Sequence, residues 1–408
     1  MASLILWALV FSNFAHSQEK ALEAPPTEED VLYIEALKSI AEGRKGDASI
    51  TLKRLIAKAP YHAGAFMELA LIQCQIGNEA EAESFFKTIE QGFPPEPAIA
   101  EIIAHQRALG CKQFKRQSHA NFSLGRGYDQ NVNQGASNPI FSIPRGTGQI
   151  ELQLSPEFLP RPDHFTTLNA DYSLELTSNG GLGFVQLFAR ANDHLNRYNN
   201  TALFIGFEQS WRLGTWAGKN TVLTGWVGLG GELYQRQSQL QMRINPPLRL
   251  SERWQAGFSA NLSHTQYLTL SNFNANILEL RAHLGWQAGQ SALQASTGYL
   301  IDRGSAARPG GERKGWLSSV QLRSAIKGNL LGDIAWTHQT WLGQTDYLPG
   351  LIDRRRDQET NILRAGLQYP LGAKQSLQLE WRQTWNRENI SIYQYQNRQL
   401  QLNWLWQY

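Results

Sequence analysis

The sequence predicts an α + β multidomain protein, in which N-terminal α-helical repeats precede a 14-stranded antiparallel transmembrane β-barrel. From Thr27 to Leu109, small and apolar residues recur with helical spacing and a longer internal period. Beyond Phe114, apolar and polar residues alternate with a period of two. Tight turns and longer polar connections alternate between these stretches, as the two ends of an antiparallel barrel require.

The last stretch of the chain shows the strand pattern most clearly. Every second residue at its end is apolar or aromatic, and mostly polar residues stand between them: Leu400, Leu402, Trp404, Trp406 and Tyr408. A half-buried strand of a soluble sandwich has the same pattern. The stretch also resembles the terminal strand of bacterial outer-membrane barrels, which implies that the barrel assembly machinery reads these five residues as an insertion signal.

Composition narrows the functional classes. Apolar residues make up 42% of the chain, mean hydropathy is −0.40, and aromatic residues are frequent, as expected for a wall that alternates between lipid and water. The formal net charge of +3 is too small to indicate nucleic-acid binding. Two cysteines exclude a disulfide scaffold and a cysteine-rich metal site, so we expect no cofactor and no metal.

The first residues predict export. Residues 1–17 contain a short apolar core, Leu4 to Phe11, and a small-x-small cleavage site, Ala15 to Ser17, so they are predicted to be a signal peptide. Residues 18–26 are predicted to be a linker. Since no membrane helix is expected, an exported chain belongs in the periplasm, the outer membrane or the medium. Together with the barrel pattern, this predicts a cell outer-membrane protein. Its helical domain, residues 27–112, is placed in the periplasm, and its barrel comprises residues 113–408.

The helical stretch repeats at an interval of 34 residues. This interval relates five pairs of positions: Gly43 and Gly77, Ala36 and Ala70, Ala48 and Ala82, Leu52 and Phe86, and Pro60 and Pro94. The pattern resembles the tetratricopeptide repeat, in which small residues let helices approach and glycine permits the turn between them. We predict two repeats, Thr27–Pro60 and Tyr61–Pro94, covered by a last helix, Pro97–Leu109.

The repeat register implies a binding groove. In tetratricopeptide domains the first helix of each pair lines the concave face, which here gives a client-binding groove of Tyr33, Leu37, Met67 and Leu71. The alternative, that these residues pack between helices, stays open. Cys74 and Cys111 are expected on neighbouring segments, where they either form a disulfide in the oxidising periplasm or remain two buried thiols.

The barrel stretches carry charge on one face only. We expect this face to line the lumen with both signs of charge: Glu279, Arg281, Asp333, Arg364, Glu380 and Arg382. Longer external connections are predicted at Tyr234–Ser238 and Tyr347–Asp357, among others. Ser137–Pro162 is predicted to be mostly the first external loop, in which Gln149–Leu154 could extend a strand.

No enzyme motif is present. The sequence lacks G-x-S-x-G, H-E-x-x-H, the Walker A pattern and a paired-cysteine motif. We therefore expect a protein that is not an enzyme. A barrel hydrolase that assembles its catalytic residues from distant strands is the alternative.

The start of the barrel carries a distinctive local motif, Gly127-Tyr128-Asp129-Gln130-Asn131-Val132-Asn133, followed by Leu154-Ser155-Pro156 and Asp163-His164-Phe165. Together with the helical repeats and the fourteen strands, it resembles the surface lipoprotein assembly modulators (Slam) of Gram-negative bacteria over nearly the whole mature chain. Asp129 and Asn131 either form hydrogen bonds that fix the exit from strand to loop, or contact the substrate.

The resemblance implies an outer-membrane translocator. It would deliver client proteins, either surface lipoproteins or small secreted proteins, to the cell surface or the medium. Its partners would be the client, outer-membrane lipid and the barrel assembly machinery. The short helical domain leaves client recognition open. The first alternative function is a polysaccharide exporter, for which many repeats and a lumen of one charge sign are expected. The second is a passive porin, in which the helical domain has no role.

Overall fold

The computed structural model describes residues 27–93, 97–111, 116–145, 148–213, 215–248, 250–251 and 253–408. The chain divides into two compact units, a helical one and a β-barrel. The predicted signal peptide, the linker, Pro94 and the predicted domain boundary between residues 112 and 113 lie outside the described residues.

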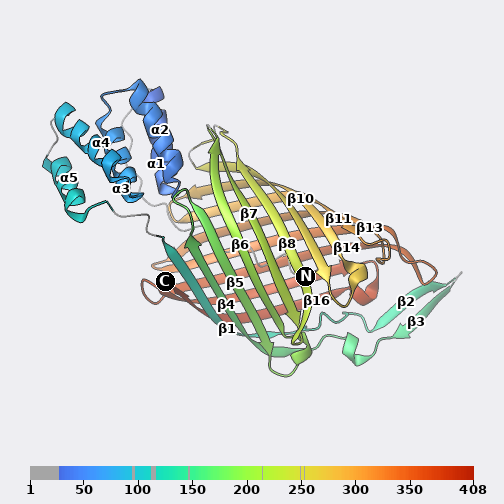
Figure 1. The fold of residues 1–408 in the computed structure, drawn as a ribbon. Helices are drawn as coiled ribbons and strands as arrows, with labels where there is room; N and C mark the ends of the chain where they lie inside the picture. Colours follow the sequence, from blue (N-terminus) through green and yellow to red (C-terminus); the bar gives the residue numbers. More distant parts are fainter. Residues whose placement is uncertain are drawn as a thin grey trace. The chain divides into compact units, whose positions relative to one another are not determined.

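The helical unit consists of five helices (Figure 1): α1 Glu28–Ala41, α2 Lys45–Lys58, α3 Ala63–Gln75, α4 Glu79–Gly92 and α5 Pro97–Leu109. Helix α1 begins at a capping box, in which Thr27 accepts a hydrogen bond from the Asp30 amide and the Asp30 carboxylate accepts one from the Thr27 amide. None of the described helices is long and apolar enough to cross a membrane.

The predicted period appears as two helical hairpins, α1–α2 and α3–α4. Gly43 and Gly77 occupy equivalent turns with φ of 74° and 85°, a left-handed conformation that glycine adopts without steric cost. The four alanines of the period are completely buried, and they allow close helix contact: Ala36, Ala48, Ala70 and Ala82. The repeated small residues therefore lie at the contacts between neighbouring helices, where a larger side chain would keep the helices apart.

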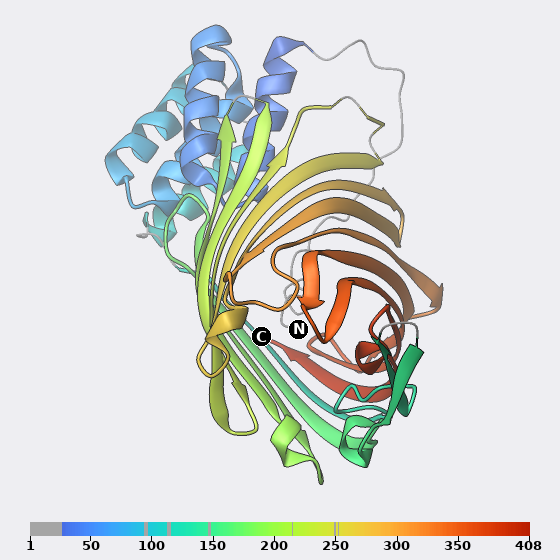
Figure 2. The same ribbon diagram turned by 90° about the vertical axis from the view of Figure 1, so that its right-hand side faces the viewer.

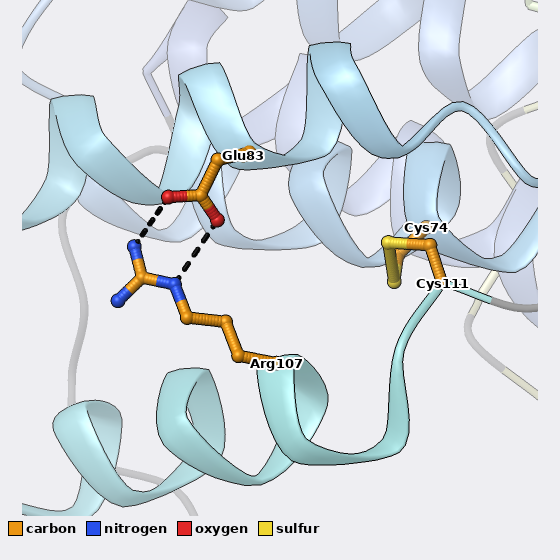
Figure 3. The surroundings of a disulfide bond; sticks show 4 residues. All are labelled: Cys74, Glu83, Arg107 and Cys111. Atoms are coloured by element: carbon orange, nitrogen blue, oxygen red, sulfur yellow. Dashed lines mark hydrogen bonds and ion pairs between the residues drawn. A yellow bond between two sulfur atoms is a disulfide. The ribbon is translucent and has the colours of Figure 1, made fainter.

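A disulfide and an ion-pair cluster hold α5 to the second hairpin (Figure 3). Cys74 of α3 is bonded to Cys111, with a Cα–Cα distance of 4.4 Å. Arg107 of α5 donates to both carboxylate oxygens of Glu83, at 2.8 and 3.0 Å, and to Glu90 at 2.7 and 3.0 Å. The bidentate contacts act on α5 itself, and the covalent bond acts two residues beyond its end.

Fourteen strands close into an antiparallel barrel in which chain neighbours pair and β1 pairs with β16 (Figures 1 and 2). The strands of the barrel are β1 Ser118–Asp129, β4 Asp163–Glu175, β5 Gly181–Asn192, β6 Asn200–Leu213, β7 Trp216–Leu229, β8 Glu232–Asn245, β9 Trp254–Tyr267, β10 Ala275–Ala288, β11 Ser291–Gly304, β12 Arg313–Lys327, β13 Leu330–Leu348, β14 Ile352–Pro370, β15 Gln375–Glu388 and β16 Tyr395–Gln407. The predicted fold class is confirmed.

The register separates an apolar outer face from a polar inner one. Leu400 and Leu402 of β16 are 50% and 51% exposed, and the residues paired with them across β15 are Trp381 and Leu379. Gln401, between them on the strand, pairs with Glu380 and faces inward. A closed barrel with an apolar outside and a polar inside is built for the bacterial outer membrane, with both of its chain ends at the periplasmic end.

Two external connections differ from their prediction, and the first external loop contains the expected strand near Gln149–Leu154 together with one further strand. Between β7 and β8 the chain turns at Gly230–Gly231, with φ of 63° and 91°, so the predicted loop at 234–238 is wrong and lies within β8. Most of 347–357 belongs to the long strands β13 and β14, because their ladder continues as far as the pair Leu348 and Ile352. The first loop contains a hairpin that projects from the barrel, β2 Ile140–Arg145 and β3 Gly148–Gln153 (Figure 1).

Candidate functional site

The polar lumen is the candidate functional site, and ion pairs of both signs line it. The six charged residues predicted for the lumen all lie on the inner face. Arg382 donates to Glu380 at 3.1 Å, and Glu279 and Arg281 form an ion pair. Arg364 lies 3.3 Å from Asp333 Oδ2, as an ion pair without hydrogen-bond geometry, and 3.9 Å from Glu380.

A buried charge cluster fixes the connection between β11 and β12 at the external end. Asp302 is completely buried and accepts two hydrogen bonds from Arg308, at 2.7 and 2.9 Å. Arg313 donates two more to it, at 2.9 and 2.6 Å. A buried carboxylate is stable only when it is paired with a cation. The ion pair between Arg308 of this loop and Asp302 therefore fixes the loop against β11. The sequence analysis missed this cluster, since Arg308 stands in a loop with no alternation.

The external ends of β13 to β16 are joined by a second cluster that the sequence analysis missed. The hydroxyls of Tyr347 and Tyr393 are 2.8 Å apart, and Arg356 donates to Glu388 from Nε at 2.9 Å. Burial raises the pKa of Tyr393, in the connection between β15 and β16. Ile352 and Ile390 are buried beside the tyrosines. These contacts tie the β13–β14 hairpin to the neighbouring connection.

The motif at the end of β1 closes the barrel seam. Asp129 is 1% exposed and accepts hydrogen bonds from Arg190 of β5 at 2.6 Å and from Gln399 of β16 at 2.8 Å. A Cβ added to Gly127 would lie 2.5 Å from the Phe165 ring and 2.8 Å from a carbonyl oxygen of β16. Only glycine at position 127 leaves room for the Phe165 ring to pack against β1. Tyr128 points to the outer face, and the centroids of its ring and the His164 ring are 5.0 Å apart.

The two asparagines of the motif fold the first loop. Asn131 donates to the carbonyls of Gly135 and Gln396, at 3.0 and 2.9 Å, and its amide donates to Asp129 at 2.9 Å. Asn133 donates to the carbonyls of Glu157 and Leu159, at 3.0 and 2.8 Å. All of these contacts lie within the protein. They are the kind of contact that the structural interpretation of the motif predicts, and substrate contact stays an untested alternative.

A second carboxylate organises the connection between β5 and β6. Asp163, the first residue of β4, accepts hydrogen bonds from the amides of His194 and Leu195, both at 2.8 Å. The His194 ring nitrogen Nδ1 lies 3.0 Å from the same carboxylate. This hydrogen bond raises the pKa of His194, so its positive charge persists to higher pH than in a free histidine.

Three of the four predicted groove residues are half-buried, and the fourth is exposed. Tyr33 packs against a core cluster shared by α1, α2 and α3, while Met67 and Leu71 pack against a cluster shared by α3, α4 and α5. Leu37 is 37% exposed. Their role in client binding stays a prediction. Among the described residues, no group of three or more histidine, cysteine, aspartate or glutamate side chains could hold a metal ion.

No protein-family model and no curated protein matches the sequence. Solved outer-membrane proteins resemble the barrel at low identity. A loop-deletion variant of OmpT from Vibrio cholerae shares 6% identity at a TM-score of 0.38, over 72% of this chain and 99% of that one. An anion-selective porin from Comamonas acidovorans shares 7% sequence identity at a TM-score of 0.41, over 72% of this chain and 99% of that one. CdiB from Acinetobacter baumannii shares 9% sequence identity at a TM-score of 0.41, and the match covers 71% of this chain and 60% of that one.

The fold assignment therefore rests on the register of this chain. The closed barrel, the apolar outer face and the polar inner face define an outer-membrane channel or translocator in general.

Proposed function

We propose that the protein is an outer-membrane translocator that delivers client proteins, either surface lipoproteins or small secreted proteins, to the cell surface or the medium. One observation carries the proposal. A disulfide-bonded unit of two helical hairpins stands in the same chain as a barrel whose lumen pairs both signs of charge. A helical unit suits capture of an exported polypeptide, and a lumen of mixed charge suits passage of a chain of mixed composition.

The client would first meet the helical unit. The predicted groove of Tyr33, Leu37, Met67 and Leu71 would hold it, and the adjacent apolar residues Val31 and Ile34 of α1 are 46% and 47% exposed. The lumen would then supply a wet path. Because the sequence has no nucleotide-binding motif, client folding outside the cell or other machinery would supply the driving force.

Outer-membrane lipid would contact the apolar outer face of the barrel. The barrel assembly machinery would read the terminal residues of β16, of which Leu400, Leu402, Trp404 and Tyr408 are exposed on that face. A polysaccharide exporter and a passive porin are the outcomes that would replace this proposal.

Co-expression in a laboratory Gram-negative host tests the proposal. The partner would be the lipoprotein or small secreted protein encoded beside this chain, and the readout would be protease accessibility or antibody labelling of the client on intact cells. We expect client exposure to require the full chain and to fall when Thr27–Leu109 is deleted. Unchanged exposure, together with passage of small sugars or ions through the purified barrel, would favour the porin or exporter instead.

A further inference from the structure

A row of cations crosses the inner face of four neighbouring strands. Lys219 of β7 pairs directly with Arg243 of β8, Arg243 pairs with Ser259 of β9, and Ser259 pairs with Arg281 of β10. Directly paired residues share a face of the sheet, so all four belong to the lumen wall. We call them the cationic row. The row lies toward the periplasmic end, since β8 ends at Asn245 and β7 begins at Trp216.

The cationic row contains more positive than negative charge. Lys219 has one acidic partner, Glu208, at 2.7 Å, and Arg281 forms an ion pair with Glu279. Arg243 has no acidic partner in the described part of the chain, and its Nε is buried without a hydrogen-bond partner there. Like charges placed directly opposite each other destabilise a sheet, and so does a buried donor without an acceptor.

Another pair of like charges in the lumen has carboxylates beside it that compensate the repulsion. Arg364 and Arg382 are also directly opposite each other, on β14 and β15. Their charges are balanced by Asp333 and Glu380, at 3.1 to 3.9 Å. Arg243 lacks such a carboxylate, so an acceptor is missing in the cationic row.

The row also presents neutral polar groups. The Ser259 hydroxyl lies 2.7 Å from Nε2 of His283, and both residues are buried. A guanidinium presents two parallel N–H groups that match a carboxylate, and a nearby ammonium and hydroxyl extend the same recognition. An oxyanion is therefore the ligand that fits.

We propose that the cationic row binds carboxylates of an acidic polypeptide segment that enters the lumen from the periplasm. This inference rests on the proposed translocator function and names the part of the client that the lumen recognises. A polypeptide fits better than an acidic glycan because the rest of the lumen carries both signs of charge, which a uniformly acidic chain would not tolerate.

Binding of a glutamate-rich peptide to the purified full-length protein in detergent tests the proposal. The peptide carries a neutral fluorophore, and anisotropy gives its Kd. We expect Arg243→Gln to weaken binding about tenfold, the size of one charge-assisted hydrogen bond, and Arg243→Lys to retain most of it. Arg236→Gln is the matched control, because it removes an exposed cation of the same strand that lies on the outer face with Leu240, and it should leave Kd unchanged.

Two results would overturn the site: wild-type affinity in Arg243→Gln, or an equal loss in Arg236→Gln. Polygalacturonate is the glycan probe, and its tighter, Arg243-dependent binding would overturn the polypeptide assignment. Heat-dependent mobility in electrophoresis reports folding of each variant, and Lys219→Gln replaces Arg243→Gln if that variant does not fold. Peptide binding without client delivery by the wild type would contradict the translocator function and leave the anion site standing.

Discussion

At the scale of single residues, Gly127 shows how one missing side chain closes the barrel. The Phe165 ring occupies the space that a Cβ at this position would need. We expect Gly127→Ala to destabilise the barrel by about 1–3 kcal/mol, the usual cost of overpacking, because ring or strand must move. Urea unfolding in detergent would measure it. Gly372→Ala is the control, since nothing lies within 4 Å of its added Cβ, and an equal loss in both variants would contradict the packing argument.

Glu68 of α3 makes the stability of the helical unit depend on pH. Burial raises the pKa of Glu68, and burial together with the Glu68 charge raises the pKa of nearby Tyr33. A carboxylate with a raised pKa is neutral more readily in the folded state. Its contribution to stability is therefore full below its ordinary pKa of 4.5 and is lost as pH rises through the higher folded value.

Glu68→Gln should accordingly raise the melting temperature of the helical signal in circular dichroism at about pH 8 and change it little at about pH 4. The control is Glu101→Gln, an exposed position on α5. A melting temperature that the Glu68 substitution lowers at pH 8 would show that the ionised group is stabilised instead.

At the scale of elements, the disulfide decides how firmly α5 covers the second hairpin. Cys74→Ser should lower the stability of the helical unit by about 2–4 kcal/mol, since the bond restricts the unfolded chain between positions 37 residues apart. The same loss should follow reduction of the wild type, and reduction should not affect the variant further. Loss of signal from the barrel strands under these conditions would contradict a role confined to the helical unit.

The elements also show what a sequence can and cannot predict. The interval between Gly43 and Gly77 and the alternation along β16 predicted helices and strands, because each pattern reflects burial on one face. The last part of the β13–β14 ladder was not predicted, because residues 353–357 are an uninterrupted run of charged residues, a composition that loops also have. The contacts of Arg243 could not be predicted either. Alternation gives the face of a residue, but strand register decides its neighbours.

At the scale of the whole molecule, the lumen is the proposed path of the client. The inner wall offers balanced ion pairs, one cationic row near the periplasm, and external connections fixed by Asp302 and Arg356. A path along the outer face would leave the inner charges without a role in transport.

The most direct test places a photo-crosslinking amino acid at two successive residues of β8 in cells that export the client. Gln241 pairs with Thr221 and Asn261 on the inner face, while Leu240 is 51% exposed on the outer face. We expect the client to crosslink at position 241 and not at position 240. A client that reaches the surface without crosslinking at 241, or that crosslinks at 240 alone, would contradict passage through the lumen.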